Sequence, residues 1–212
     1  TPFEIDCAAG DMLVQIQTWL DAVSATDNCG DVIITNDFDA ANLTTTGCGS
    51  LTVTFTAVDE CENSSTITST ITIIDDQAPA FNEITPLEVD CAASDMSAQI
   101  QAWLNAVTAT DNCGIVSISN DFNADDLTTT GCGSLTVTFT AEDECGNSAS
   151  TTSTITIVDD QAPVFDEITP LDLACDANDM LTQINAWLDA VTATDNCSIV
   201  SISNDFAAES LP

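Results

Sequence analysis

The sequence predicts a mostly β protein made of tandem β-sandwich repeats, each with one inserted α-helix, arranged as beads along a string. Three observations predict this class. All ten cysteines fall on four positions that recur at one constant interval, and the segment from Leu43 to Ala57 recurs unchanged from Leu127 to Ala141. One segment with helical periodicity lies in the first half of each repeat, and strictly alternating segments fill the second half.

The repeat length sets the expected domain organisation. Cys7, Cys91 and Cys175 hold the same position in three successive repeats, since 91 − 7 = 84 and 175 − 91 = 84. A unit of this length is large enough for a small domain with its own core. We expect repeat 1 at residues 1–76, beginning inside the unit, a complete repeat 2 at 77–160, and repeat 3 at 161–212 without its final hairpin. The last quarter should then be disordered unless a following unit or a neighbouring chain covers it.

The residues from Asp95 to Val107 predict the helix of repeat 2. Its apolar residues follow a 3.6-residue period, and Asp95 can cap the first turn or complement its dipole. One tryptophan lies on the apolar stripe of each repeat, where a large ring is best used for core packing. The expected core tryptophans are Trp19, Trp103 and Trp187.

The second half of the repeat predicts a β-hairpin. Apolar residues and threonines alternate from Ser134 to Ala141 and again from Thr152 to Val158, which is the pattern of half-buried strands. The residues between these strands, from Asp143 to Asn147, are typical of a turn. Further extended segments are expected from Ile84 to Asp90 and from Ile115 to Asn120, the latter followed by a loop.

The charge is extreme and of one sign. The chain has 35 acidic residues and no lysine, arginine or histidine, which gives a formal net charge of −35. The chain cannot hold phosphate by cationic side chains, which argues against nucleic-acid binding and excludes polybasic attachment to a membrane. The apolar residues, 44% of the chain, are patterned, which argues against disorder. No apolar stretch is long enough to form a membrane span.

The residue inventory also argues against catalysis. General acid–base catalysis most often uses histidine, and a Ser–His, Cys–His or lysine nucleophile cannot be assembled from this sequence. Carboxylate pairs remain, but the acids recur in every repeat and lie in turns and linkers. We therefore expect no enzyme activity.

Several phrases resemble a known repeat family. ATDNCG, TVTFTAEDECGNSAS and TITIVDDQAP are similar to the hyalin-type (HYR-like) immunoglobulin-fold repeats of large secreted surface adhesins and filament proteins of Bacteroidota. The resemblance covers the whole unit, although the early helix departs from the plain hyalin repeat. It implies an immunoglobulin-like sandwich, a secreted or bacterial cell-surface location, and an adhesive or structural array with no catalytic residues to carry over.

The cysteines indicate a disulfide framework and an oxidising compartment, because zinc sites need CxxC spacing or histidine. In an immunoglobulin-like unit, the helix would return the chain to the near end, beside the final hairpin turn. This favours the pairs Cys29–Cys61, Cys113–Cys145, Cys7–Cys48 and Cys91–Cys132. A sequential scheme stays open: Cys7–Cys29, Cys48–Cys61, Cys91–Cys113, Cys132–Cys145 and Cys175–Cys197.

Acidic residues gather where two repeats join. The linker acids are followed by Gln-Ala-Pro, an order that partly resembles the calcium-binding linkers of cadherins, and two acidic turns of the next repeat should reach the same junction. Ca²⁺ takes six to eight oxygen ligands, so it could stiffen each junction and offset the charge. Alternatively, these acids only form turns and keep the chain soluble. The candidate ligands are Asp75, Asp76, Asp111, Asp143 and Glu144 at the first junction, and Asp159, Asp160 and Asp195 at the second.

The sequence thus predicts an extracellular structural or adhesive repeat array, a segment of a long surface fibre or filament. The alternative is a ligand-binding adhesin domain for a glycan or for ice, with calcium-stiffened repeats. The near-identity of the units favours the structural interpretation, because a binding domain should carry one atypical unit with exposed aromatic residues. Expected partners are the neighbouring repeats, other copies in a fibre, and a host or environmental surface.

Overall fold

A computed structural model describes residues 1–43, 47–114, 116–127, 132–174 and 179–207. The described structure is mostly β, with one ten-residue helix at the same place in each repeat. The helices α1 (Met12–Asp21), α2 (Met96–Asn105) and α3 (Met180–Asp189) recur at the interval of the cysteines. This confirms the predicted fold class. None of the helices in the described ranges is long and apolar enough to cross a membrane.

Contacts between Cα atoms divide the chain into two compact units whose bounds cut across the sequence repeats. The first unit combines Thr1–Ile84 with Val107–Asp121 and Thr138–Thr152. The second combines Thr85–Ala106 with Phe122–Val137 and Ser153–Pro212. One end of repeat 2 therefore belongs with repeat 1, and the other end belongs with repeat 3.

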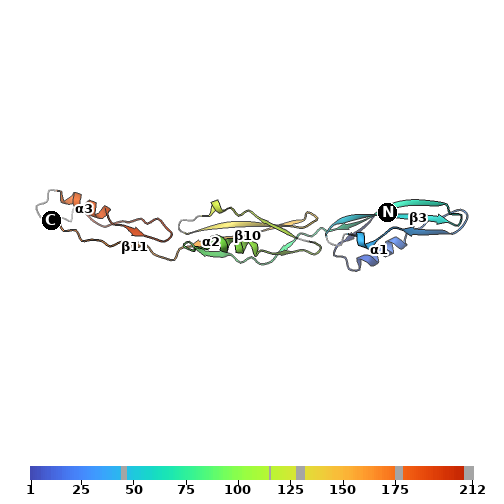
Figure 1. The fold of residues 1–212 in the computed structure, drawn as a ribbon, viewed down its shortest axis with the longest axis horizontal. Helices are drawn as coiled ribbons and strands as arrows, with labels where there is room; N and C mark the ends of the chain where they lie inside the picture. The colour runs from blue at the N-terminus through green and yellow to red at the C-terminus, as the bar shows by residue number, and fades with distance from the viewer. Residues whose placement is uncertain (44–46, 115, 128–131, 175–178, 208–212) are drawn as a thin grey trace. The chain divides into compact units, whose positions relative to one another are not determined.

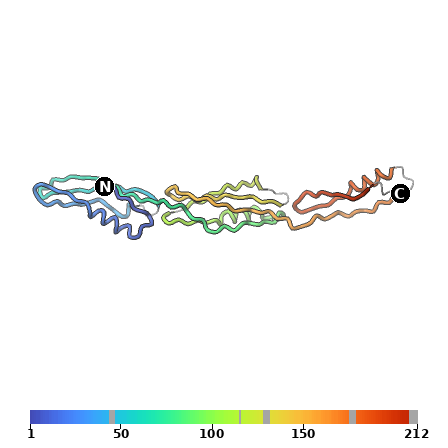
Figure 2. The backbone as a smooth tube through the Cα atoms, turned by 180° about the vertical axis from the view of Figure 1, so that it is seen from behind, coloured from blue at the N-terminus to red at the C-terminus, as the bar shows by residue number. Residues whose placement is uncertain are grey.

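The first unit contains a four-stranded sheet with the order β1-β4-β3-β2. Its long hairpin, β3 and β4, is antiparallel, and Figure 2 follows the backbone through it. Strand β2 adds antiparallel to β3, whereas β1 lies parallel to β4, with Phe3 opposite Ile71. The strands are β1 (Phe3–Asp6), β2 (Val32–Asn36), β3 (Gly49–Asp59) and β4 (Ser64–Ile74). A 3₁₀ turn, η1 (Ala40–Asn42), lies between β2 and β3.

Helix α1 covers one face of this sheet (Figure 1). Its stripe residues Ile16 and Leu20 are buried, and they pack on the inward residues of the alternating strands, such as Val53 and Phe55. The burial of such a stripe holds a short helix better than its own propensity does. The core of this unit consists of Ile5, Ile16, Leu20, Leu43, Val53, Phe55, Ile71 and Ile73.

The tryptophans lie at the rim of the core and are half-buried. Trp19 stacks on Phe3 and meets Phe55 edge-on, with ring centroids 5.7 and 5.6 Å apart. Its indole N–H donates to the carbonyl of Thr1, and the other two tryptophans make the same bond to the equivalent threonine of their own repeats. The predicted packing role is therefore combined with a polar one, as the indole N–H requires.

The helix starts differ in one detail from the expected capping. Asp11, Asp95 and Asp179 occupy the N-cap position, but their carboxylates make no capping hydrogen bond. The carboxylates of Asp95 and Asp179 instead accept from the side-chain amides of Gln99 and Gln183 on the next turn of the helix.

Repeat 2 uses the same pattern of strands. Its sheet has the order β6-β10-β9-β8, and β6 lies parallel to β10. In the second unit, Val89, Val137, Ile155 and Ile157 are buried together with the α2 residue Ile100. The strands are β6 (Leu87–Asp90), β8 (Ser117–Asn120), β9 (Gly133–Glu142) and β10 (Ser148–Val158). The expected loop after β8 contains a 3₁₀ turn, η2 (Ala124–Asp126).

Two short ribbons were missed by the sequence patterns. Strand β5 (Ala80–Phe81) pairs antiparallel with β7 (Ala109–Thr110), and β11 (Val164–Phe165) pairs in the same way with β12 (Ala193–Thr194). Each ribbon joins the end of a linker to the segment that follows the helix. Two-residue strands are too short to leave an alternating pattern.

The expectation of a disordered last quarter is wrong for residues 179–207. Helix α3 forms, Ile184 is buried, and the indole of Trp187 donates to the carbonyl of Thr169. The linker strand β11 pairs with β12, although the side chains of Val164 and Phe165 stay exposed.

The disulfides correct both predicted pairing schemes. The described residues form Cys7–Cys113, Cys48–Cys145 and Cys91–Cys197, and each bond joins one repeat to the next. Neither the pairs Cys29–Cys61, Cys113–Cys145, Cys7–Cys48 and Cys91–Cys132 nor the sequential pairs Cys7–Cys29, Cys48–Cys61, Cys91–Cys113, Cys132–Cys145 and Cys175–Cys197 are found, and Cys175 lies outside the described residues. Cys29, Cys61 and Cys132 are exposed free thiols.

The cysteines pair between repeats because the far end of one repeat meets the near end of the next. The two ends of an immunoglobulin-like unit put Cys7 and Cys48 at the far end of repeat 1, and Cys113 and Cys145 at the near end of repeat 2. The predicted pairs join cysteines of one end within the same repeat. Because the far end of one repeat meets the near end of the next inside the first compact unit, each far-end cysteine bonds across the junction instead.

Candidate metal centre at the junction of two repeats

The linker after β4 crosses the junction in an extended course. The N–H of Cys7 donates to the carbonyl of Ile74 at 2.9 Å, which fixes the first cysteine beside the start of the linker. Further along, the carbonyl of Asp75 accepts from the side-chain amide of Asn147 at 3.0 Å. Strand β5 then pairs with β7, so both the acidic turns of repeat 2 lie against the linker of repeat 1.

Three carboxylates from distant parts of the sequence meet there. One oxygen each of Asp75, Asp111 and Asp143 lies within 4.8 Å of the others. Asp143 is only 7% exposed, and the other two side chains are half-buried. All three belong to the first compact unit. The structure thus brings together three of the five ligands predicted for this junction.

The hydrogen bonds of Asp143 hold its carboxylate in the charged form. Burial alone would raise the pKa of Asp143, but hydrogen bonds from the side chain of Asn147 and from the backbone N–H groups of Asn147 and Cys145 outweigh it. The pKa of Asp143 therefore lies below its ordinary value. The carboxylate of Asp143 is thus held as a buried anion, a form that a cation can bind without first displacing a proton.

Two carboxylate oxygens of these residues have no hydrogen-bond partner among the described residues. The second carboxylate oxygens of Asp75 and Asp111 are both buried and unpartnered, while their first oxygens accept from the backbone N–H groups of Gln77 and Cys113. Buried polar atoms are normally paired, so unpaired ones call for an explanation such as an ion.

The other two predicted ligands at this junction lie elsewhere. Asp76 and Glu144 are exposed. Glu144 instead covers Gly47, whose backbone has a φ of +79° and whose N–H donates to the carbonyl of Cys113. A Cβ at residue 47 would lie 2.9 Å from an oxygen of Glu144. Glu144 therefore packs on the turn at Gly47 and does not join the acidic cluster.

The second junction shows part of the same arrangement. The hydroxyl of Ser198 lies within hydrogen-bond distance of both Asp159 and Asp195 and can donate its one proton to either, and the second oxygen of Asp195 is buried without a partner among the described residues. The pKa of Asp195 is lowered, chiefly by the hydrogen bond from the backbone N–H of Cys197 and then by the hydroxyl of Ser198. Asp160 is exposed, as Asp76 is at the first junction.

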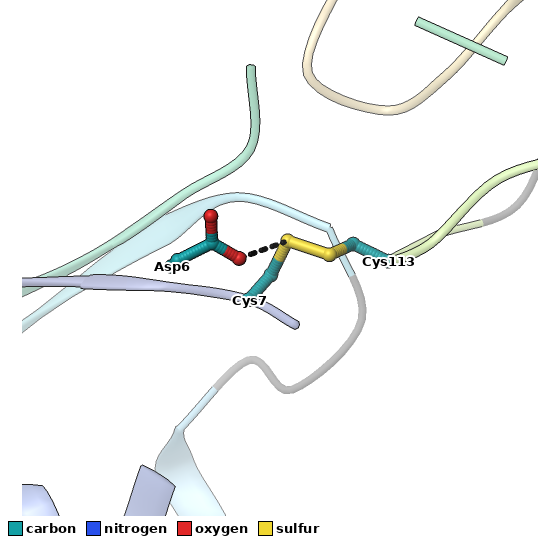
Figure 3. A group of neighbouring side chains, drawn as sticks. All are labelled: Asp6, Cys7 and Cys113. Carbon is teal, nitrogen blue, oxygen red and sulfur yellow. Dashed lines mark hydrogen bonds between the residues drawn. A yellow bond between two sulfur atoms is a disulfide. The ribbon is translucent and has the colours of Figure 1, made fainter. Parts of the chain in front are cut away.

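Two further acidic groups lie beside disulfides and are poor metal sites. Figure 3 shows the carboxylate of Asp6 next to the bond between Cys7 and Cys113, with Asp6 Oδ1 3.8 Å from the sulfur of Cys7. Asp90 has the corresponding place beside Cys91–Cys197. The metal-binding form of cysteine is the thiolate, and sulfurs already joined to each other cannot supply it.

The cluster of Asp75, Asp111 and Asp143 has the chemistry of a site for a hard divalent cation. Its side-chain donors are all oxygens, they include the two unpartnered ones, and the carbonyl of Asp75 is close by. Carboxylate and carbonyl oxygens suit calcium and other hard cations, whereas zinc favours nitrogen and sulfur ligands, so these residues fit a hard cation better than they fit zinc.

The fold and the junction together define a class: a mostly β repeat protein whose successive units are joined by disulfides and by acidic, cation-fitting junctions. The chain is 29% identical over 200 residues to an uncharacterized 81.3 kDa protein of Acholeplasma phage L2, covering 92% of this chain and 27% of the relative. It is 28% identical over 188 residues to hyalin of Strongylocentrotus purpuratus, covering 84% of this chain and 15% of hyalin. The chain is thus a β-domain protein similar to hyalin, and it spans at most about a quarter of these relatives. No family model matches it.

Solved structures of cadherin domains overlap with it only loosely. Human protocadherin-24 EC1-2 is 11% identical, with a TM-score of 0.29, covering 66% of this chain and 87% of that one. Human CDH23 EC21-23 is 20% identical, with a TM-score of 0.32, covering 70% and 55%. Overlap at this level does not establish a shared fold.

Proposed function

We propose that this chain is an extracellular, non-catalytic segment of a structural and adhesive surface array, in the manner of a fibre or filament on a bacterial cell. The observation that carries the proposal is the placement of the disulfides. Two bonds, Cys7–Cys113 and Cys48–Cys145, cross one junction, and Cys91–Cys197 crosses the next. Bonds within a unit would protect its core, whereas bonds between units strengthen the connection that carries load along an array.

The disulfides also favour an oxidising, extracellular location, as the proposal requires. Disulfides persist in secreted and surface proteins, and the similarity to hyalin points to the same kind of repeat. A net charge of −35 keeps such an array soluble but makes neighbouring units repel each other. Covalent bonds across the junctions hold the units together against this repulsion.

Calcium bound by Asp75, Asp111 and Asp143 completes the proposal. A divalent cation there would pair with the unpartnered oxygens of Asp75 and Asp111 and offset the charge of Asp143. Its effect would be mechanical, because the ligands come from two repeats and a shared ion restrains their relative motion. The predicted ligands Asp76 and Asp160 are exposed, so they would add negative charge near the junction without binding the ion.

The calcium proposal is tested by thermal unfolding of the whole chain with and without about 10 mM Ca²⁺, a concentration well above the Kd expected of an extracellular module. Extracellular calcium modules bind with Kd values of roughly 10⁻⁴ to 10⁻³ M, so binding should stabilise the folded state by about 1.4–2.7 kcal/mol. The shift should be largely absent in Asp143→Asn. It should persist in the matched control Asp76→Asn, which also removes one charge from the junction but at an exposed position. Equal shifts in both variants would show that Ca²⁺ only screens the surface charge.

The location and role are tested on intact cells that produce the protein. Antibodies against the chain should label unpermeabilised cells, and the label should disappear after proteolytic shaving with an enzyme that cuts at acidic or apolar residues. Labelling only after permeabilisation would contradict a surface array. Saturable binding of a single purified glycan to one repeat would favour the alternative of a dedicated ligand-binding adhesin.

A further inference from the structure

The near end of repeat 1 has nearly the same residues as the near end of repeat 2, but no linker of a preceding repeat covers it in the described structure. In repeat 2, Ala141 is fully buried, and Asp143 is buried beside Asp75 of the linker of repeat 1. Their counterparts one repeat earlier, Ala57 and Asp59, are only half-buried. Asn147 reaches the linker carbonyl of Asp75, whereas its counterpart Asn63 is exposed.

A groove lies where the linker would run. Between the segment that follows α1 and the β3–β4 turn is a pocket of about 180 Å³, with Ala25, Asp27, Ala57 and Asp59 in its lining. A second pocket of about 230 Å³ adjoins it and shares Ala25 and Ala57. Ala25 and Thr26 correspond to β7, which pairs with the linker strand β5, but in repeat 1 they form no strand.

The free thiols beside this groove are the counterparts of bonded cysteines. Cys29 corresponds to Cys113, which is bonded to the first cysteine of the preceding repeat, and Cys61 corresponds to Cys145, which is bonded to the third. Both Cys29 and Cys61 are exposed and unbonded. The groove and the two thiols of repeat 1 therefore correspond to the surface of repeat 2 that binds the linker and the cysteines of repeat 1.

The geometry points to a receptor for one more unit of this same repeat. We propose that the groove and thiols of repeat 1 accept a unit standing before Thr1 in the same polypeptide. Its Asp-Asp-Gln-Ala-Pro segment lies against Ala25 and Thr26 as β5 lies against β7, and its first and third cysteines bond Cys29 and Cys61. Its linker aspartate joins Asp27 and Asp59 to rebuild the three-carboxylate cluster. This rests on the junction described above but does not depend on calcium binding.

The covalent step is an oxidation that balances by thiol–disulfide exchange with a small disulfide such as oxidised glutathione. The thiolate of Cys29 attacks the glutathione disulfide, and one glutathione thiol leaves. The first cysteine of the incoming unit then attacks the mixed disulfide, forms the protein S–S bond and releases the second glutathione thiol. Two protein S–H bonds are replaced by one S–S bond, and glutathione takes up the two electrons and both protons. Cys61 and the third cysteine react in the same way.

The test joins a second copy of residues 85–168 ahead of Thr1 in the full chain. The register is kept because Thr85 and Thr169 hold the position of Thr1. After refolding with oxidised and reduced glutathione, free thiols are alkylated and the cysteine peptides are mapped by mass spectrometry. In the chain without the added copy, Cys29 and Cys61 should be alkylated. In the extended chain their alkylation should fall at least tenfold, with bonds to the first and third cysteines of the added unit.

A matched control keeps the added unit but replaces its last linker residues, the copy of Gln161–Phe165, by a glycine-serine segment of equal length. If the groove selects its occupant, Cys29 and Cys61 stay alkylated in this control and the amides of Ala25 and Thr26 exchange hydrogen quickly. Bond formation without the segment would refute the groove as receptor. The proposal would be overturned by a Cys29–Cys61 bond, by Cys29 and Cys61 that stay alkylated in the extended chain, or by disulfide-linked oligomers in place of the bonds within one chain. The Asp75, Asp111 and Asp143 site is unchanged in all these chains, so its calcium response can be scored separately.

Discussion

When the chain is stretched, the disulfides should carry the force along a covalent path much shorter than the backbone. Residues 7 and 197 are 190 positions apart in sequence, since 197 − 7 = 190. In the oxidised chain a shorter covalent path exists: from Cys7 across to Cys113, back along the backbone to Cys91, and across to Cys197. That path follows the backbone over only 22 positions, since 113 − 91 = 22.

These paths differ greatly in length when fully stretched. At about 3.6 Å per residue, the shorter path with its two bridges reaches roughly 90 Å, whereas the reduced chain reaches roughly 680 Å between the same residues. Either pairing scheme confined to single repeats would give an intermediate value of roughly 380–400 Å by the same rule, with its own bridges included. Reduction should therefore lengthen the fully unfolded segment between these residues about seven- to eightfold.

Single-molecule force spectroscopy measures this length directly. Handles attached near Thr1 and near Ala207 allow the contour length to be read before and after addition of a reductant. A contour length of several hundred ångströms in the oxidised chain would refute the inter-repeat pairing. The triple variant C29S/C61S/C132S is the control, because it removes the three thiols that are free among the described residues and that could exchange with the bonded cysteines under load.

Three further predictions concern single residues. Gly47→Ala should destabilise the junction by about 1–2 kcal/mol in chemical denaturation, because the left-handed backbone at residue 47 disfavours a Cβ, which would also meet Glu144; an unchanged midpoint would show that the turn is free to rearrange. Phe139→Ala should cost about 3–5 kcal/mol of unfolding free energy because the ring is fully buried, and truncation of the largely exposed Ile33 should cost under about 0.5 kcal/mol. The pKa of Asp121 is lowered from its ordinary value of 3.8, chiefly by the hydrogen bond from the backbone N–H of Thr138. Its stabilising effect should be present above that value and lost as the pH falls through the lower folded pKa; an NMR titration of Asp121 with an inflection at or above 3.8 would contradict this.

The elements with strong periodicity were predicted closely. The helix expected from Asp95 to Val107 forms as Met96–Asn105, and the strand expected from Ser134 to Ala141 forms as Gly133–Glu142. Both elements bury one face, and burial is what imposes a period on a sequence. The linker ribbon of β5 and β7 has two residues on each side, which leaves no period to detect.

The candidate site was predicted in part, for a reason that the linker makes clear. Asp75 and Asp76 are adjacent in an extended segment, so their side chains point to opposite sides, and only Asp75 faces the acidic turns. The sequence shows both acids equally and does not show which side is covered. Cysteine partners have the same difficulty, because spacing identifies a position in the repeat but not the repeat that supplies its partner.

The crossing disulfides also change what damage to the backbone can do. Any single peptide bond broken between residues 8 and 196 leaves both fragments joined by at least one of the bonds Cys7–Cys113, Cys48–Cys145 or Cys91–Cys197. A protease must therefore cut this stretch more than once to release a piece, and trypsin-like enzymes find no lysine or arginine to cut at all. A chain bonded in this way stays in one covalent piece after a single cleavage in this stretch.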